Sequence, residues 1–507
     1  MRKIIGISII VLMLLSICVS VDSLKISNYN ETDYDPLVDV EVSVVIDGIR
    51  YLENEEQQDA KSKLPKPLTK ILNFLTLFPF FEKIFTNKFS DKTTINEDNN
   101  APSMYVKVYI NDIEFVSHSW NNNFYIYKPG WTATLNVPDD QELVDIKIQV
   151  WDSKDDIICD ISGDTDGGND GYDAELIYSI KDGHWTGDDS LGDPSGYGRL
   201  NGCDDGTIHQ TDKDCEIWFR ILQNDYDNDG IPYWTEVYDY QTDPEIKDSG
   251  DPDNDNIPTD WEWKWGYNPF KHDYHGKFDD DGDSLDNLEE YLTSQWFSDP
   301  FRKDVFVEMD IMGDGPNGEK TYFPVEAKEL IYNAFNRQNI VLHIDMGEMG
   351  GHETIPFDDE VVHDFITDRE FFDIYENYFL HGNKYNWRRG VFHYGVVVYK
   401  SSGPAGYMFQ NNAFQISSKG HEKLAAENPW YNINVIYGSA YMHELGHTFN
   451  FWPIPGHDRN ADFDEVKAYK SCMNYGWMYK LVDYSDGSRE EPDIDDWSRI
   501  DYHFFER

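Results

Sequence analysis

The sequence is poor in basic residues. Lys and Arg number 42 in 507 residues against 95 Asp and Glu, which gives a formal net charge of -53. Such a chain repels a phosphate backbone and offers no counterion release, which argues against a nucleic-acid partner. The same charge would strain a compact state by self-repulsion unless cations neutralise part of it, and divalent cations with oxygen ligands meet that need. Surface solubility alone is the other explanation of the acidic composition.

Cysteine is also scarce, with five residues in the whole chain. Cys18 lies in an N-terminal apolar run, and in an oxidising compartment Cys203 and Cys215 could close a short loop, although the four remaining cysteines permit three full pairings.

Disorder is excluded, because 40% of the residues are hydrophobic and 15% are aromatic. The length predicts two to four folding units with separate cores.

Long apolar runs are rare as well. One run, from Ile4 to Val21, follows Met1-Arg2-Lys3, so residues 1–23 are expected to be a secretory signal or an uncleaved N-terminal anchor. A shorter run at 72–81 lies in a locally basic insertion, 61–100, and is broken by Pro79. The insertion is expected either to lie on a membrane surface or, more simply, to cover a neighbouring domain. The protein is therefore expected outside the cell, secreted or attached to the outer cell surface.

Alternating apolar and polar residues mark the first third of the chain. The period of two at 38–46, 106–110 and 144–150, between Asn, Asp and Gly clusters, predicts a β-sandwich over residues 36–223. Its loops are rich in carboxylates: Asp152, Asp155, Asp156, Asp160, Asp164, Asp166 and Asp170. The pattern resembles a C2-type sandwich, which implies calcium at the loop tips.

Residues 224–300 contain three acidic segments that repeat at spacings of 26 and 28 residues. In each, a Glu follows the first Asp by eleven residues, which is the ligand spacing of an EF-hand-type loop: side chains at positions 1, 3 and 5, a carbonyl at 7 and a bidentate carboxylate at 12. The expected calcium ligands are Asp225, Asp227, Asp229, Ile231 and Glu236; Asp251, Asp253, Asp255, Ile257 and Glu262; and Asp279, Asp281, Asp283, Leu285 and Glu290. The segments resemble thrombospondin type-3 calcium repeats, which implies a linker with little regular structure. Position 6 is Gly in the first segment but Asn256 and Ser284 in the others.

An α/β pattern begins beyond residue 300. Strands are expected at 305–309, 340–345 and 392–399, and helices at 324–337 and 433–451. On the last helix His443 and His447 are one turn apart, so one zinc ion can bridge both imidazoles. Glu444 lies beside them as the expected general base for a zinc-activated water.

Zinc needs a third protein ligand. The helix motif with Met473 and Tyr475 downstream resembles the metzincin clan of zinc metallopeptidases, and the C-terminal stretch is similar to that of secreted prokaryotic members. The resemblance covers 301–507 and implies a third His close after the helix, a Met-turn beneath the metal, and Tyr475 binding the metal or stabilising the oxyanion. The usual Gly is replaced by Asn450, which can also end a helix in the left-handed conformation.

The third ligand is expected to be His457, ten residues after His447, across an inserted loop. Asp458 is the nearest competitor. Glu465 would serve in a gluzincin-type arrangement, which the Met-turn disfavours.

The fold is thus expected to be multidomain, with an N-terminal β-sandwich, a calcium-repeat linker and a C-terminal α/β (α+β) metzincin-like domain. The expected function is a secreted or surface-attached zinc endopeptidase that cleaves protein or peptide substrates and is stabilised by calcium, so Zn²⁺ and Ca²⁺ are the expected cofactors. The alternative is a calcium-dependent surface adhesion protein whose protease-like domain is inactive. A third possibility is a peptidase that acts on the organism's own envelope from an uncleaved anchor.

Overall fold

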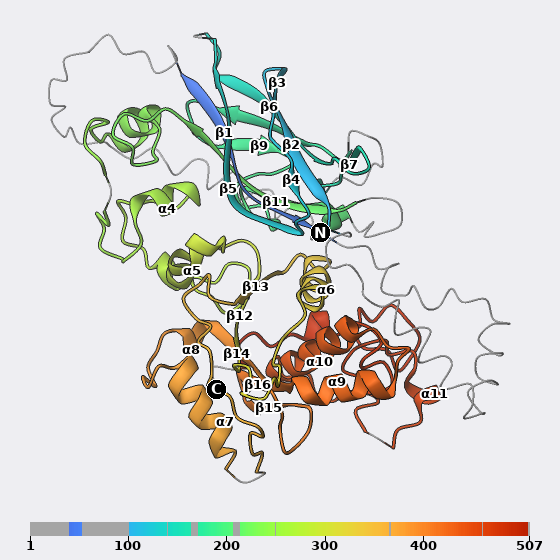
Figure 1. The fold of residues 1–507 in the computed structure, drawn as a ribbon. Coiled ribbons are helices and arrows are strands. Elements are labelled where there is room, and N and C mark those ends of the chain that lie inside the picture. The colour runs from blue at the N-terminus through green and yellow to red at the C-terminus, as the bar shows by residue number, and fades with distance from the viewer. Residues whose placement is uncertain are drawn as a thin grey trace, which may run out of the picture.

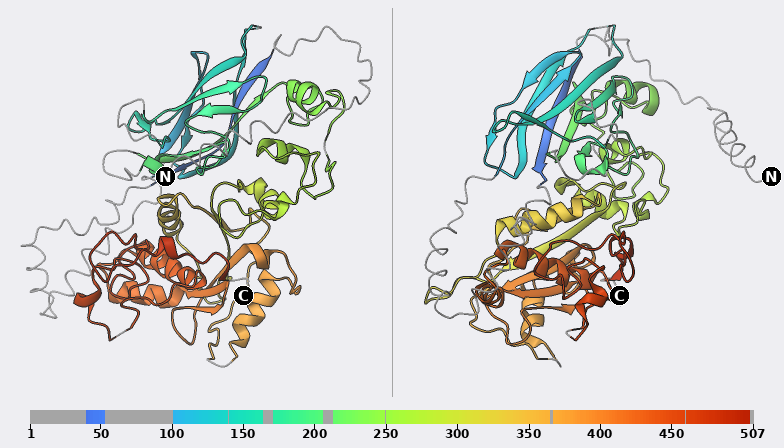
Figure 2. Two further views of the ribbon diagram at one scale, coloured as in Figure 1. Left: turned by 180° about the vertical axis from the view of Figure 1, so that it is seen from behind. Right: turned by 90° about the vertical axis from the view of Figure 1, so that its right-hand side faces the viewer.

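The computed structural model describes residues 40–52, 101–138, 140–163, 171–205, 213–248, 250–364, 367–458 and 460–504. The predicted signal or anchor, the insertion at 61–100 and the carboxylates Asp164, Asp166 and Asp170 lie outside these residues. Three parts follow one another along the described chain: a β-sandwich, an acidic spacer at 225–300, and an α/β C-terminal domain (Figure 1). The spacer runs along one side of the molecule from the sandwich to the C-terminal domain (Figures 1 and 2). None of the helices in the described ranges is long and apolar enough to cross a membrane.

The sandwich is built from two antiparallel sheets. Its strands are β1 (Glu41–Tyr51), β2 (Ser103–Ile110), β3 (Ile113–Val116), β4 (Trp120–Asn121), β5 (Tyr125–Asn136), β6 (Leu143–Asp152), β7 (Ile157–Cys159), β8 (Ala174–Ser179), β9 (Trp185–Gly187), β10 (Arg199–Asn201) and β11 (Cys215–Gln223). One sheet has the order β10-β11-β1-β5; the other has the order β3-β2-β6-β8-β9, with β4 on β2 and β7 on β6. The alternating residues Val42, Val44 and Ile46 of β1 and Val106 and Val108 of β2 are fully buried in one core between the sheets.

One sequence expectation for the sandwich is wrong. Cys203 and Cys215 are not joined in a disulfide: the Cys203 thiol faces the carboxylate of Asp214 at 3.7 Å, whereas Cys215 packs on the sulfur of Met104 at 4.0 Å.

The expected calcium at Asp152 and Asp155 stays a prediction, and it would have to compete with a side-chain cation. The ammonium of Lys213 lies 2.6 Å from the Asp152 carboxylate and 2.7 Å from that of Asp155, so a side-chain cation already pairs with both. This contact, with two backbone N–H donors, lowers the pKa of Asp152 although burial opposes the shift.

The acidic spacer has more regular structure than its sequence predicts. Short helices follow the three acidic loops: η5 (Thr235–Tyr240), α4 (Thr259–Lys264) with η6 (His275–Lys277), and α5 (Asn287–Thr293) with η7 (Ser294–Trp296). The Glu at position 12 of each loop lies in or beside the first turn of the helix that follows, where a carboxylate is favoured. The spacer also shares a core with the sandwich through Ile257, Trp261 and Trp265, so it is packed against the sandwich.

The C-terminal domain has a five-stranded sheet between two layers of helices. Its elements are β12 (Asp304–Ile311), α6 (Val325–Asn336), β13 (Val341–Asp345), α7 (Arg369–Ile374), η8 (Tyr375–Phe379), α8 (Arg388–Val391), β14 (Phe392–Val398), β15 (Gly406–Gln410), β16 (Ala413–Ser417), α9 (Ser418–Glu427), α10 (Ile433–Thr448), α11 (Phe463–Val466) and η9 (Trp497–Arg499). The strand order is β13-β12-β14-β16-β15, and only β15, at an edge, runs antiparallel to its neighbour. α6 and α10 pack together on one face, and α7 and η8 cover the other.

Candidate metal centres

Three imidazoles meet at the end of α10. The Nε2 atoms of His447 and His457 each lie 3.3 Å from Nε2 of His443, and the ligand nitrogens of all three lie within 4.8 Å of one another. Zn–N bonds of about 2.0–2.1 Å at tetrahedral angles place ligand nitrogens about 3.3 Å apart. The donor set and its spacing therefore fit one zinc ion.

A backbone hydrogen bond orients the first of these imidazoles. Nδ1 of His443 is 2.9 Å from the carbonyl oxygen of Cys472, and because a carbonyl only accepts, Nδ1 carries the proton. Nε2 then keeps its lone pair toward the other two histidines. Burial lowers the pKa of all three imidazoles, that of His447 to about 4, so they are neutral at pH 7.

Gly446 lets the turn at Met473 pack against α10. A Cβ atom at Gly446 would lie 2.5 Å from Sδ of Met473 and 3.0 Å from the ring of Phe451. Met473 is fully buried, and the next residue, Asn474, holds the turn by donating to the carbonyls of Val466 and Tyr469, at 2.9 Å each. A side chain at position 446 would displace the turn that carries the Cys472 carbonyl.

The chain leaves α10 through the predicted left-handed Asn450, whose φ is 61°. The N–H of Phe451 then donates to the carbonyl of Gly446 at 3.3 Å, which satisfies one of the last helical carbonyls. Farther along, Gly456 (φ 72°) turns the chain back, and its carbonyl accepts from the N–H of Tyr475 at 3.2 Å. This bend brings His457 to the helix pair.

The two alternative third ligands are both exposed side chains. Asp458 is exposed, and its carboxylate accepts from the N–H of Asn460 at 2.8 Å. Glu465 is also exposed, on α11.

Glu444 is a buried acid next to the histidine cluster. Its side chain lies against β15, where a Cβ at Gly406 would come within 2.6 Å of Oε1. Burial raises the pKa of Glu444 to about 8, which is the range in which a carboxylate can accept and return a proton near neutral pH.

Tyr475 stacks on two of the three histidines. Its ring centroid lies 4.4 Å from that of His457 and 5.6 Å from that of His443, and 37% of the residue is exposed. The ring is therefore held beside the cluster, and the residue is partly exposed.

The three acidic loops of the spacer share one backbone geometry. Positions 4 and 6 are left-handed in every loop: Asn228, Gly230, Asn254, Asn256, Gly282 and Ser284 have φ between 63° and 95°. The N–H at position 6 donates to the Asp at position 1, at 2.7, 2.7 and 3.2 Å, and the N–H at position 7 donates to the Asp at position 5, at 2.8, 2.9 and 2.7 Å. Asn256 and Ser284 therefore take the conformation that Gly takes in the first loop, at some cost in strain.

Carboxylate oxygens converge inside each loop. Several buried loop oxygens have no hydrogen-bond partner among the described residues: Asp227 Oδ2, Glu236 Oε2, Asp253 Oδ1 and Oδ2, Glu262 Oε2, Asp281 Oδ2, and Glu290 Oε1 and Oε2. Burial and mutual repulsion raise the pKa of Glu236 to about 8, and the pKa values of Asp281 and Glu290 are raised for the same reasons. Buried groups of carboxylate oxygens such as these fit a hard divalent cation such as Ca²⁺.

Two further residues join these loops and were missed in the sequence. Carboxylate oxygens of Asp248 lie within 4.8 Å of those of Asp229 and Glu236, and His275 lies equally close to Asp255 and Glu262. Both come from outside the twelve-residue loop pattern, so the motif itself gives no signal for them.

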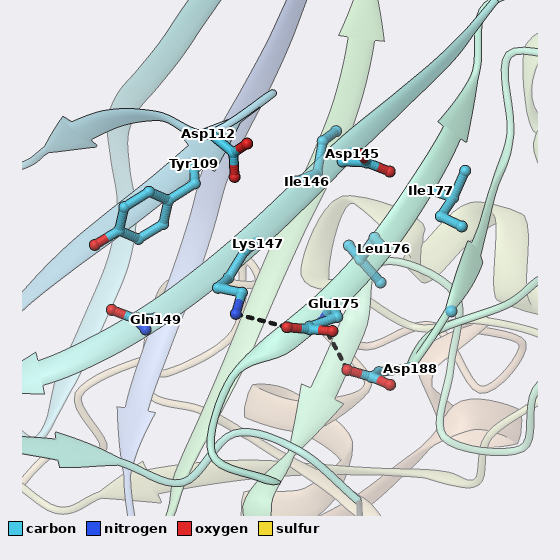
Figure 3. A pocket seen from close by; sticks show the side chains of 11 residues that line it. Tyr109, Asp112, Asp145, Ile146, Lys147, Gln149, Glu175, Leu176, Ile177 and Asp188 are labelled. Carbon is cyan, nitrogen blue, oxygen red and sulfur yellow. Dashed lines mark hydrogen bonds and ion pairs between the residues drawn. The ribbon is translucent and has the colours of Figure 1, made fainter. Parts of the chain in front are cut away.

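A hollow of about 750 Å³ lies on the outer face of the larger sandwich sheet, around Tyr109, Lys147 and Glu175 (Figure 3). Two of its charged side chains pair with each other: the ammonium of Lys147 is 2.6 Å from the carboxylate of Glu175, and the N–H of Glu175 donates to Asp188 at 2.6 Å.

No protein-family model matches the chain, and no curated protein matches it. Among solved structures, it is similar to the paired C2 domains of Extended-Synaptotagmin 2 in their calcium-bound form, at 7% identity over 37% of this chain and 44% of that chain, with a TM-score of 0.17. It is also similar to a C2 domain-containing protein from a putative elicitor-responsive gene (11% identity, 36% and 85% covered, TM-score 0.16) and to human GIVD cytosolic phospholipase A2 (9%, 36% and 17%, 0.16). Another Extended-Synaptotagmin 2 chain, which carries an SMP domain before its C2 domains, is covered over 27% of its length. At such TM-scores these likenesses carry no argument about activity. The multidomain, β-rich fold with its two-sheet sandwich follows from the strand pairing.

Proposed function

We propose that this chain is a zinc-dependent endopeptidase, secreted or surface-attached, whose C-terminal domain is of metzincin type and is stabilised by calcium. The observation that carries the proposal is the cluster of His443, His447 and His457 with a buried carboxylate beside it. Three neutral nitrogen donors leave one position of a tetrahedral ion open, which is the arrangement of catalytic zinc sites.

Zinc bound there would act as a Lewis acid and lower the pKa of a bound water toward about 7. The three histidines hold the ion, and the Cys472 carbonyl keeps the His443 ring in the orientation that binding needs. Glu444 takes the proton of the attacking water on a carboxylate oxygen and returns it to the leaving amine. Burial of Glu444 against β15 keeps bulk water from competing for that proton.

Tyr475 is the candidate for stabilising charge on the scissile carbonyl. Its phenol is a hydrogen-bond donor held beside the histidines by stacking on His457, and it is open to an incoming ligand.

The edge of the sheet favours a peptide as the substrate. Among the described strands β15 pairs only with β16, so its outer edge presents backbone N–H and C=O groups, and its residues are mostly half-buried. An extended peptide can add to such an edge as one more strand. Because Gly406 of β15 touches Glu444, a peptide on this edge passes beside the proposed base.

Metal removal and reconstitution test the proposal. Full-length protein stripped of zinc in millimolar calcium should lose hydrolysis of an unfolded generic protein, and one equivalent of zinc should restore it. A zinc-loaded, calcium-replete protein that hydrolyses no peptide bond would instead favour the alternative, a calcium-dependent adhesion protein with an inactive protease-like domain. Retention of all three histidines and of Glu444 is the reason for ranking the peptidase first.

A further inference from the structure

Each acidic loop is closed by a residue that lies well downstream of it. The Asp at position 5 of each loop accepts a hydrogen bond within the loop on Oδ1, and its Oδ2 contacts a residue outside the loop. In the first and third loops this oxygen accepts from a backbone N–H, that of Asp248 on Asp229 at 2.9 Å and that of Asp304 on Asp283 at 2.6 Å. In the second loop, Asp255 Oδ2 lies 3.0 Å from Nε2 of His275. The closing residues follow position 5 by 19, 20 and 21 residues. In all three loops position 5 therefore contacts a residue beyond the loop motif, through a backbone N–H in the first and third loops and through an imidazole in the second.

In the first two loops the closing side chain reaches the cation cage. Ligand atoms of Asp248 and Glu236, and of His275 and Glu262, lie within 4.8 Å of each other, in each case together with the position-5 Asp. The equivalent residue of the third loop, Asp304, is 2% exposed, and its N–H donates to the position-5 carboxylate of that loop at 2.6 Å.

The third cage also contains an acid with no partner of its own. Glu290 is 1% exposed, and neither of its carboxylate oxygens has a hydrogen-bond partner among the described residues. A bidentate Glu at position 12 is the ligand that an EF-hand-type loop supplies, and calcium takes six to eight oxygens in all.

We propose that Asp304 completes the third calcium site, so that one ion joins the acidic spacer to the first strand of the C-terminal domain. This inference rests on the calcium-stabilised peptidase proposed above. Asp304 begins β12, which pairs with β13 and β14. Its carboxylate oxygen Oδ1 is 2.5 Å from Nε2 of His343 on β13, so the ion is linked through one side chain to two strands of the sheet.

The same short segment also contacts the sandwich. Arg302, two residues before Asp304, is fully buried, and its guanidinium lies 3.0 Å from the carboxylate of Glu216 on β11. Sandwich, spacer and C-terminal domain therefore meet within three residues. Loss of the third ion would leave several buried carboxylates facing one another at this junction.

Counting calcium ions in full-length protein tests the assignment. Titration of chelator-treated wild type with calcium should give three ions, and Asp304→Asn should lose the third or bind it at least about tenfold more weakly, because ligand charge sets the affinity of such sites. Asp310→Asn is the matched control: Asp310 is fully buried on the same strand, but its carboxylate accepts from Tyr394 at 2.8 Å. That variant should keep three ions.

Two outcomes separate this inference from the proposed function. A wild-type chain that binds no calcium would overturn the calcium part of the proposed function together with this inference. Three ions of unchanged affinity in Asp304→Asn would overturn this inference alone.

Hydrogen exchange of the wild type provides a second test that needs no folded variant. Filling the third site should slow exchange of the backbone amides at 304–309 and leave those of β6, in the sandwich, unchanged. Equal exchange at 304–309 with and without calcium would contradict the proposal.

Discussion

Replacing Gly446 by alanine should destabilise the C-terminal domain although alanine is the better helix former. In an open helix interior the substitution would gain about 0.8–1.0 kcal/mol. Here the new Cβ would lie 2.5 Å from Met473 Sδ and 3.0 Å from Phe451, both of which are buried and closely packed. Overpacking of a dense core costs about 1–3 kcal/mol, and a contact this short belongs at the upper end, so the net loss is about 2 kcal/mol.

A loss of that size should lower the thermal midpoint by roughly 4–8 °C for a domain of about 200 residues. The assay is thermal unfolding in zinc and calcium, followed by tryptophan fluorescence. Gly390→Ala on α8 is the matched control, because a Cβ there meets only Glu289 Oε1, at 4.0 Å. It should leave the midpoint unchanged or raise it slightly.

A double variant tests the contact itself. Met473→Ala removes the sulfur that the new Cβ would strike, so adding Gly446→Ala to Met473→Ala should cost less than Gly446→Ala costs alone. A rise in midpoint for Gly446→Ala comparable to that of Gly390→Ala would refute the reasoning, since it would mean that the Met-turn does not press on α10.

Two further predictions concern the metals. His457→Ala should leave the purified protein depleted of zinc, whereas Asp458→Ala and Glu465→Ala should keep about one equivalent, because the latter two side chains are exposed. The zinc content is measured by elemental analysis, and stoichiometric zinc in His457→Ala would contradict the ligand assignment. Without calcium, burial raises the pKa of Glu236 from 4.5 to about 8, so the folded state binds the proton of this carboxyl more tightly than the unfolded state does. The contribution of protonated Glu236 to the free energy of unfolding is therefore complete below pH 4.5 and is lost as the pH rises through about 8. Calcium should therefore raise the thermal midpoint more at pH 9 than at pH 5, and equal increments at both pH values would contradict this.

The sequence predicts local periodic features well. The pentapeptide from His443 to His447 was enough to propose two ligands and a base, because helical geometry alone places i and i+4 on one face. The place of His457 beside the other two histidines is harder to predict from the sequence. It depends on the left-handed backbone conformations of Asn450 and Gly456, which bend the chain back toward α10.

The residues that sequence reasoning missed are those that reach a site from a distant segment of the chain. Asp248, His275 and Asp304 lie outside the loop motif, although their spacing of 19 to 21 residues from position 5 is a signal that becomes readable once the geometry is known. Lys213 was missed as the cation for Asp152 because 61 residues separate the two in the chain. The short helices of the spacer were missed because loops of this type were expected to carry little regular structure.

The central claim is that Glu444 moves the proton in a zinc-dependent hydrolysis. Its most direct test is the rate of peptide-bond hydrolysis by Glu444→Gln beside the wild type, with zinc content determined on the same preparations. The account predicts one equivalent of zinc in both proteins and a rate that falls by about 10²–10⁴-fold in the variant. Glu465→Gln, an exposed acid outside the cluster, is the control and should hydrolyse at the wild-type rate. Hydrolysis by zinc-replete Glu444→Gln at the wild-type rate would contradict the account.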